Sequence, residues 1–132
     1  MNSRVSPSSR ILVVDDERSI LFALKDYFLL HGYQVDCAEE MEEAQALLAN
    51  VQYSLAIVDM RLTGFGGAEG LEVLSFLKER CPWTRVMIWT GSDSAAIEKE
   101  VRRRGVDCYL HKPMPLAEVA RVAIGLLGAV CA

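Results

Sequence analysis

The stretch ILVVDDE, from Ile11 to Glu17, decides the fold of this chain. Four apolar residues of the kinds that strands favour are followed at once by three acids. This order is typical of a strand that is buried on both faces and ends at the ligand-binding edge of a parallel sheet. Similar apolar runs recur at Leu55–Val58 and Arg85–Trp89. We therefore expect three central strands in one parallel sheet.

Two less apolar segments, Gln34–Ala38 and Cys108–His111, complete a set of five predicted strands and are interpreted as edge strands. Segments with helical periodicity alternate with the strands, which predicts βα units around a parallel sheet. The apolar positions that mark the first four predicted helices are Ile20, Leu21, Leu24, Tyr27 and Phe28, then Met41, Ala44, Leu47 and Leu48, then Leu71, Leu74 and Leu77, and finally Ile97 and Val101.

The ends of the helices also have signals in the sequence. Gly32 and the pair Cys81-Pro82 are predicted to end the first and third helices. The fourth helix is expected from about Ala95 to Arg104, before Gly105, and the fifth from after Pro115 to about Leu127. The longest connection is expected from Asp59 to Gly70, and it contains several glycines, which in a compact domain indicates a functional or mobile loop.

Length and composition restrict the class of protein. The 132 residues are enough for one globular domain, and 52% hydrophobic with 24% charged residues exclude a disordered chain. The net charge of −4 argues against direct nucleic-acid binding, which depends on clustered Lys and Arg. One basic run, Arg102–Arg104, follows Glu98 and Glu100 at a spacing of four residues, so it is interpreted as stabilising the end of a helix.

The four cysteines give no sign of a metal site. Cys37, Cys81, Cys108 and Cys131 form no C-x-x-C pair, and His31 and His111 do not supply metal-site spacing with them. They are interpreted as buried or incidental thiols. Because the N-terminal segment also lacks the apolar region of an export signal, the expected location is the cytoplasm.

The C-terminal segment Val122–Ala132 carries no charge. It is shorter than the roughly 20 apolar residues that cross a bilayer, so no membrane association is expected. One side of this helix is expected to pack on the sheet. Its lack of a polar face indicates either a partner or dimer surface or a chain cut short before a further domain.

Chemically active side chains follow four of the predicted strands. Asp15 and Asp16 come after the first strand, Asp59 after the third, Thr90 after the fourth, and Lys112 after the fifth. Because parallel strands end at one edge of the sheet, we expect these groups to converge. Singly, each has an ordinary explanation, such as a helix cap, an Asx turn or a solvated lysine. Four such groups at four strand ends favour a site.

Three carboxylates in one pocket need a cation. Two like charges about 4 Å apart repel by about 4 kcal/mol at an effective dielectric constant of 20, and Lys112 offsets only part of this. The remainder suits a hard divalent ion such as Mg²⁺, which carboxylates, water and a phosphoryl group commonly bind. With the metal bound, Asp59 is a candidate nucleophile toward phosphorus, while Lys112 and Thr90 would stabilise the phosphoryl oxygens.

From Arg10 to about Leu127 the chain resembles the receiver domain of bacterial two-component response regulators, the CheY-like family. The resemblance rests on Ile11–Glu17, Val58-Asp59-Met60, Trp89-Thr90-Gly91 and the segment from Tyr109 to Pro113. It implies a flavodoxin-like (βα)5 α/β fold with three layers, a doubly wound parallel five-stranded sheet and strand order 2-1-3-4-5. Residues 1–9 are expected to be a flexible tail and residues 10–132 the receiver domain.

The resemblance also implies a role for each site residue. Asp59 would be the phosphoacceptor, and Asp16, Asp59 and the backbone carbonyl of Arg61 would ligate Mg²⁺ (or Mn²⁺), with Asp15 acting through water. Lys112 would bind the phosphoryl group and precede a cis peptide bond to Pro113. Thr90 would be the switch hydroxyl and Tyr109 the switch aromatic ring, the first moving toward the phosphoryl group and the second turning inward on phosphorylation.

Some positions depart from the family pattern. The loop after Asp59 looks about three residues longer than is common in the family, Thr63 stands where a proline is frequent, and Trp89 is bulkier than expected. Arg61 and Ser92 lie where such families tune the lifetime of the phosphoryl group. The sequence alone therefore does not determine how accessible Asp59 is to water or to a partner.

The resemblance favours a signalling switch that catalyses its own phosphorylation and dephosphorylation, rather than a metabolic enzyme. The expected phosphodonor is a sensor histidine kinase or a histidine phosphotransfer protein. The expected output surface, for a homodimer or an effector, is the face made by the fourth helix, fifth strand and fifth helix. Two kinds of protein remain as alternatives. The chain is either a stand-alone receiver in a phosphorelay or chemotaxis-like pathway, or the truncated receiver of a DNA-binding transcriptional regulator.

Two other function classes compete with this interpretation. A phosphohydrolase with an Asp59 intermediate is disfavoured, because the position two residues later, where haloacid-dehalogenase-type phosphatases place an acid, is Arg61. A flavodoxin-like cofactor binder is disfavoured because Asp15 and Asp16 would repel a phosphate in the first βα loop.

Overall fold

The computed structural model describes residues 10–61 and 68–130, and in these ranges the chain forms one five-stranded parallel sheet with strand order β2-β1-β3-β4-β5. The strands are β1 (Arg10–Val14), β2 (Gln34–Ala38), β3 (Leu55–Val58), β4 (Arg85–Thr90) and β5 (Cys108–His111). The helices are α1 (Arg18–Leu30), α2 (Met41–Asn50), α3 (Ala68–Arg80), α4 (Ala95–Arg103) and α5 (Leu116–Val130). The predicted fold class and strand order are confirmed.

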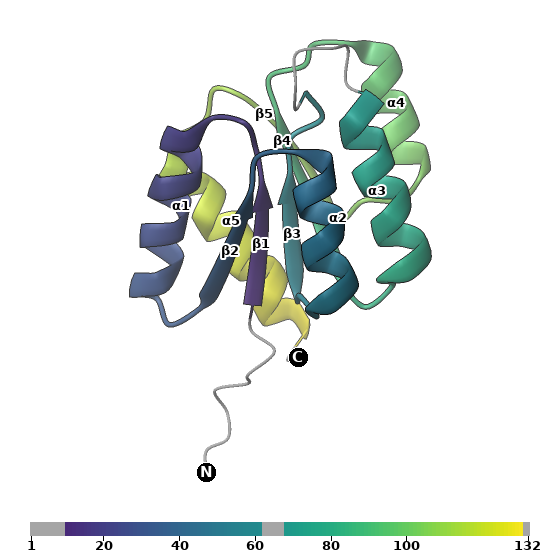
Figure 1. The fold of residues 1–132 in the computed structure, drawn as a ribbon. Coiled ribbons are helices and arrows are strands. Elements are labelled where there is room, and N and C mark those ends of the chain that lie inside the picture. The colour runs from purple at the N-terminus through teal and green to yellow at the C-terminus, as the bar shows by residue number, and fades with distance from the viewer. Residues whose placement is uncertain (1–9, 62–67, 131–132) are drawn as a thin grey trace.

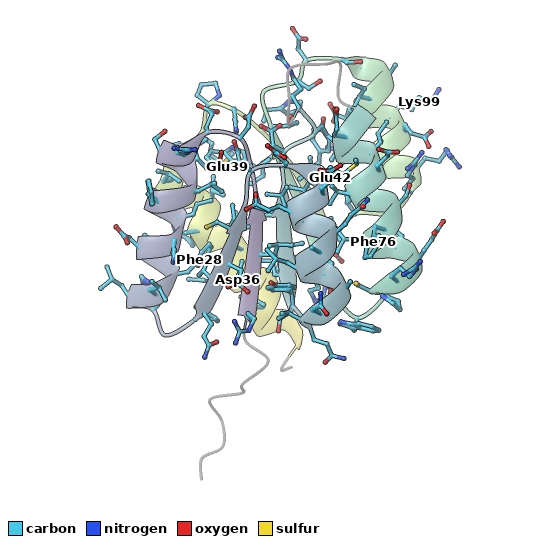
Figure 2. The ribbon with its side chains drawn as sticks, in the orientation of Figure 1. Phe28, Asp36, Glu39, Glu42, Phe76 and Lys99 are labelled. Atoms are coloured by element: carbon cyan, nitrogen blue, oxygen red, sulfur yellow. The ribbon has the colours of Figure 1, made fainter. Side chains whose placement is uncertain are left out.

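Helices cover both faces of the sheet, which gives three layers (Figure 1). Side chains alternate along β1, so that Ile11 and Val13 pack with α1 and α5, whereas Leu12 and Val14 pack with α2, α3 and α4. Figure 2 shows Phe28 on α1, and this residue belongs to the same core as Ile11 and Val13. The sheet therefore separates two hydrophobic cores.

The three central strands are the ones that the sequence predicts to be buried on both faces. Every residue of β3 is buried, as are four of the five in β1 and five of the six in β4. β2 and β5 form the two edges of the sheet, and in each of them buried residues are interspersed with more exposed ones. This arrangement confirms which strands were expected at the edges.

Several predicted boundaries were wrong by a few residues. The loop after Asp59 was expected to extend to Gly70, but α3 begins at Ala68, so Gly70 lies inside the helix. α5 continues past Leu127 to Val130, and β4 includes Thr90 as its last residue. The other notable loop position, Thr63, lies outside the described residues, as do Cys131 and the N-terminal segment 1–9.

Gly70 allows a close approach between α3 and the chain that follows β3. A Cβ atom at this position would lie 2.6 Å from the carbonyl oxygen of Met60 and closer still to its Cα. Met60 is completely buried and directly follows Asp59. The glycine therefore lets the first turn of α3 pack directly against the backbone that carries Asp59.

The helix α4 is attached to the domain by a small apolar contact through Val101 and Ile97 and by polar contacts at its C-terminal end. Val101 is its one fully buried residue. The guanidinium of Arg104 donates to the hydroxyl of Ser75 on α3 at 2.7 Å, and the ammonium of Lys78 donates to the carbonyl of Gly105 at 2.6 Å. Lys99 points away from the body of the domain (Figure 2). α4 thus rests on the domain with little apolar burial of its own.

The basic run at the end of α4 is paired, as predicted. Arg102 donates to Glu98 at 2.9 Å and Arg104 to Glu100 at 2.7 Å, while Arg103 also pairs with Glu100. These arginines therefore stabilise the helix end instead of forming a free basic patch.

The described cysteines Cys37, Cys81 and Cys108 are free thiols that are buried or half-buried. Among residues 10–61 and 68–130, every helix falls short of the length and apolar character that a membrane span requires.

Candidate functional site

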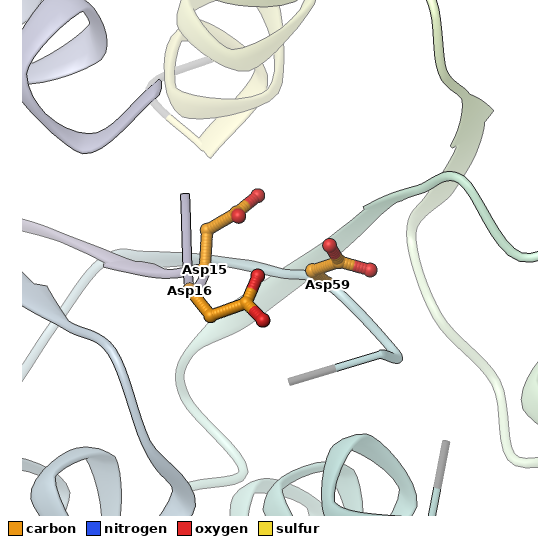
Figure 3. A group of neighbouring side chains, drawn as sticks. All are labelled: Asp15, Asp16 and Asp59. Atoms are coloured by element: carbon orange, nitrogen blue, oxygen red, sulfur yellow. The ribbon is translucent and has the colours of Figure 1, made fainter. Parts of the chain in front are cut away.

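Three aspartates meet at the carboxyl ends of β1 and β3. Asp15 and Asp16 directly follow β1, and Asp59 directly follows β3, which is the neighbouring strand. One carboxylate oxygen from each lies within 4.8 Å of those of the other two (Figure 3). Asp15 and Asp59 are buried, whereas Asp16 is exposed. The predicted convergence of these residues is therefore observed.

Asp59 is surrounded by donors on both of its oxygens. Its Oδ1 atom accepts hydrogen bonds from the hydroxyl of Thr90 at 2.6 Å and from the backbone N–H of Arg61 at 3.0 Å. Its Oδ2 atom accepts from the ammonium of Lys112 at 3.0 Å. The residue is only 5% exposed, so these interactions are weakly screened by solvent.

Lys112 bridges the acids of the site. Its Nζ atom donates to Asp15 at 2.8 Å, to Asp59 at 3.0 Å and to Glu17 at 3.1 Å. Burial alone would lower the pKa of Lys112, but the hydrogen bond and charge of Asp15 together with those of Asp59 outweigh burial and raise this pKa. Lys112 is therefore a permanent cation of the site. The cis peptide bond between Lys112 and Pro113 is confirmed.

The surroundings of Asp15 and Asp16, the two carboxylates that follow β1, disfavour their charged forms. Burial raises the pKa of Asp15 above 3.8, and the contacts with Lys112 and the N–H of Glu17 offset this only partly. Burial and the charge of Asp59 likewise raise the pKa of Asp16. Burial therefore disfavours the charged form of both groups, and three carboxylates beside one lysine leave net negative charge at the site.

Two of the acids also have the ordinary local role that the sequence left open. The Oδ1 atom of Asp15 accepts the N–H of Glu17 at 2.9 Å, and Oδ1 of Asp59 accepts the N–H of Arg61 two residues on. These Asx-type turns fix the direction of each carboxylate. The local turn and the shared pocket are therefore compatible, because the turn uses one oxygen and leaves the other free for Lys112.

The two residues predicted to act as the switch, Thr90 and Tyr109, occupy buried positions. Thr90 is completely buried at the end of β4, and the N–H of Ser92 donates to its hydroxyl oxygen at 3.2 Å. Tyr109 on β5 is 7% exposed. Burial, followed by the charge of Glu98, raises the pKa of Tyr109. Thr90 already contacts Asp59 here, and the Tyr109 ring already points inward.

Glu17 and Ser92 are site residues whose contacts sequence reasoning did not assign. Glu17 is the third acid of the opening stretch and pairs with Lys112. Ser92 links Thr90 to the residue before α4, because its N–H donates to the Thr90 hydroxyl and its own hydroxyl accepts from the N–H of Ser94. For Glu17 the signal was present, because it belongs to the acidic run. For Ser92 the spacing of two residues from Thr90 was the available signal.

An open pocket of about 240 Å³ is lined by Asp16, Glu17 and Asp59 together with Arg61, Gly91 and Lys112. Oxygen donors from three carboxylates within 4.8 Å of one another, with one lysine to balance them, match the ligand preference of a hard divalent cation. The residues present therefore fit such an ion. Arg61 lines the same pocket, and a ligand role for its backbone carbonyl stays a prediction.

Comparison with known proteins agrees with this geometry. The family described as response regulator receiver domain matches residues 11–123. The chain is 34% identical over 113 residues to the alginate biosynthesis transcriptional regulatory protein AlgB of Pseudomonas aeruginosa, and 32% identical over 124 residues to response regulator protein FleR of the same species. These alignments cover 86% and 91% of this chain but only 24% and 26% of the relatives, so the chain spans about a quarter of their length.

Solved structures show the same fold. A CheY-like response regulator receiver domain protein from Methanospirillum hungatei superposes with a TM-score of 0.83 at 27% identity, over 92% of this chain and 94% of that one. A response regulator from Burkholderia pseudomallei, solved with a phosphorylated aspartic acid, a calcium ion and citrate, gives a TM-score of 0.75 at 25% identity, over 89% and 71%.

The family match disfavours both the phosphohydrolase and the flavodoxin-like cofactor binder. It covers most of the chain, and the strand order and the acidic site at the ends of β1 and β3 agree with it. The chain therefore belongs to the response regulator receiver domain family of two-component systems.

Proposed function

We propose that Asp59 accepts a phosphoryl group from a histidine side chain of a sensor kinase or a phosphotransfer protein. The observation that carries this proposal is the convergence on one buried carboxylate of the Thr90 hydroxyl at 2.6 Å and the Lys112 ammonium at 3.0 Å. These are the donors that a transferred phosphoryl group requires around its oxygens. The Burkholderia pseudomallei relative, which carries a phosphorylated aspartic acid, supports the same chemistry.

In the proposed transfer, a carboxylate oxygen of Asp59 forms a bond to phosphorus while the bond from phosphorus to the donor nitrogen breaks. The electron pair of the broken bond stays on the imidazole nitrogen. The negative charge of Asp59 passes to the phosphoryl oxygens. Lys112 and Thr90 bind the carboxylate before the transfer, and after it they would donate to these phosphoryl oxygens instead. Hydrolysis reverses the modification when water attacks the phosphorus and Asp59 leaves as a carboxylate.

Mg²⁺ (or Mn²⁺) is the proposed cofactor, held by Asp16, Asp59 and the carbonyl of Arg61, with Asp15 acting through water. Bound there, the ion would neutralise charge on the phosphoryl oxygens. The three carboxylate oxygens within 4.8 Å of one another support this assignment, because the single ammonium of Lys112 balances only part of their negative charge.

The test is labelling by a small phosphodonor. We expect acetyl phosphate with Mg²⁺ to add one phosphoryl group to the wild-type chain, detected by intact mass, and the Asp59→Asn variant to stay unmodified. Asp93→Asn is the matched control, because Asp93 is an exposed aspartate of the β4–α4 loop and is absent from the set of candidate ligands. Equal labelling of Asp59→Asn and wild type would contradict the proposal.

The output of the switch is proposed at the face formed by α4, β5 and α5, where it would engage a homodimer partner, an effector or a further domain. The much greater length of the AlgB and FleR relatives supports a further domain in proteins of that kind. A cytoplasmic location and intrinsic autophosphorylation and autodephosphorylation belong to the same proposal. Direct nucleic-acid binding by residues 10–132 is not expected.

A further inference from the structure

Two side chains cover the ring of Tyr109 from the outside. The guanidinium carbon of Arg102 lies 5.2 Å from the centre of this ring, within the range of a cation–π interaction. The His111 ring is also 5.2 Å away, in an edge arrangement at 61°. Among the described residues the Tyr109 hydroxyl has no hydrogen-bond partner, although it is buried. Burying a hydroxyl in this way is unfavourable, so other contacts have to stabilise the inward ring.

One carboxylate holds both of these covering groups. Oε2 of Glu98 accepts from Nε of Arg102 at 2.9 Å, and Oε1 of the same residue lies 3.3 Å from Nε2 of His111. Glu98 and Arg102 are four residues apart on α4, so the helix presents them as one unit. The Arg102 side chain is 58% exposed, and Glu98 gives this mobile cation a fixed position over the ring.

The helix that carries this pair is attached to the switch hydroxyl. The N–H of Ser92 donates to Oγ1 of Thr90 at 3.2 Å, and the N–H of Ser94 donates to Oγ of Ser92 at 3.3 Å. The Ser94 hydroxyl in turn caps α4 by accepting the N–H of Ile97 at 3.2 Å. A displacement of Thr90 is therefore linked to the helix that covers Tyr109.

We propose that Arg102 and Glu98 are positioning residues that hold Tyr109 inward in the unphosphorylated protein. For Tyr109 to turn outward, Arg102 has to leave the ring. The ratio of inward to outward rings is thus set in part by α4, before any phosphoryl group is present. The inference rests on the proposed function only for the meaning of Tyr109 as the switch aromatic. The position of the ring is measured without phosphorylation.

The test is ¹⁹F NMR of the protein labelled with fluorotyrosine, in the absence of any phosphodonor. The chain has four tyrosines, and Tyr109→Phe identifies the signal. In Arg102→Ala we expect the Tyr109 signal to move and its relaxation by a soluble gadolinium chelate to increase. Loss of one cation–π contact at an exposed site lowers the inward-to-outward ratio by about two- to fivefold.

Arg103→Ala is the matched control, because Arg103 is the next residue on α4, is exposed and is also paired with a glutamate, but it has no described contact with Tyr109. Glu98→Gln should act like Arg102→Ala, and Glu100→Gln should act like wild type. An unmoved Tyr109 signal in both Arg102→Ala and Glu98→Gln, or an equal shift in Arg103→Ala, would overturn the inference.

The labelling of Asp59 is measured separately on the same variants. If Asp59 accepts no phosphoryl group, the proposed function fails while the ring position is still decided by the NMR signal. If Asp59 is labelled normally and the ring does not respond to Arg102→Ala, the proposed function stands and the positioning role fails.

Discussion

The ammonium of Lys112 lies over the ring of Trp89, 5.1 Å from its centre. Trp89 is 4% exposed and belongs to the core between the sheet and helices α1 and α5. The same ammonium donates to Asp59 at 3.0 Å, so one cation contacts both the acidic site and the indole ring. The bulky residue before Thr90 therefore has a defined place, against the lysine of the site.

We expect the emission of Trp89 to report the occupancy of the site. Mg²⁺ or a phosphoryl group changes the charge that Lys112 faces, and the position of Lys112 over the indole changes with it. A saturable change of tryptophan fluorescence on Mg²⁺ titration should persist in Trp83→Phe, which removes the exposed second tryptophan, and disappear in Trp89→Phe. A response that follows Trp83 instead would contradict this assignment.

The Asp16→Asn substitution should stabilise the metal-free protein. Asp16 contributes one of three carboxylates within 4.8 Å, and removing its charge relieves repulsion. Because Asp16 is exposed, we discount the Coulomb energy and expect a gain of about 1 kcal/mol in the free energy of unfolding. The same variant should lose most of the additional stability that Mg²⁺ gives to wild type.

Urea unfolding with and without Mg²⁺ measures both effects, and Asp93→Asn is again the matched control for a lost exposed charge. A metal-free Asp16→Asn protein that is less stable than wild type, or one that Mg²⁺ stabilises fully, would be inconsistent with crowded carboxylates that bind a cation.

The affinity for Mg²⁺ should fall on mild acidification. The pKa values of Asp15 and Asp16 are raised above 3.8 in the folded chain, so protons compete with the metal at a higher pH than they would at ordinary aspartates. The effect of acidification on the free energy of unfolding has the opposite sign to its effect on Mg²⁺ affinity. Stability from protonation of these groups is fully present below 3.8 and is lost as the pH rises through their raised values.

Calorimetric Mg²⁺ titrations near pH 7 and near pH 5 test this prediction, with a weaker affinity expected at the lower pH. Equal affinities at the two values would mean that the carboxylates titrate as ordinary aspartates.

The Gly70→Ala substitution should destabilise the domain, although alanine is the better helix residue. Its Cβ would collide with the Met60 backbone, at a cost of about 1–3 kcal/mol typical of overpacking. Because Met60 follows Asp59, we also expect slower labelling by acetyl phosphate. Gly125→Ala on α5 is the control. Its Cβ meets no atom within 4 Å, so helix propensity alone should stabilise it by up to about 1 kcal/mol. Thermal unfolding of both variants gives the comparison.

The sheet was predictable because its central strands are continuous apolar runs, and burial on both faces leaves no other position for them. The start of α3 was not predictable, since the glycine at position 70 looks like a loop residue until the adjacent backbone of Met60 is known. The convergence of Asp15, Asp59 and Lys112 was predictable, because each residue comes just after a predicted strand and parallel strands end at one edge of the sheet. The inward ring of Tyr109 was not predictable, because it depends on Arg102, a residue that the sequence explains fully as the partner of Glu98.

The shallow attachment of α4 has a consequence for local unfolding. A helix with one buried residue, held to α3 by the side chains of Arg104 and Lys78, opens at a small fraction of the free energy that global unfolding requires. Its amide protons should therefore exchange with solvent well before those of β1 and β3. The domain can therefore change the position of α4 while the core between the sheet and helices α1 and α5 stays intact, and the other core loses only the contacts of Val101 and Ile97.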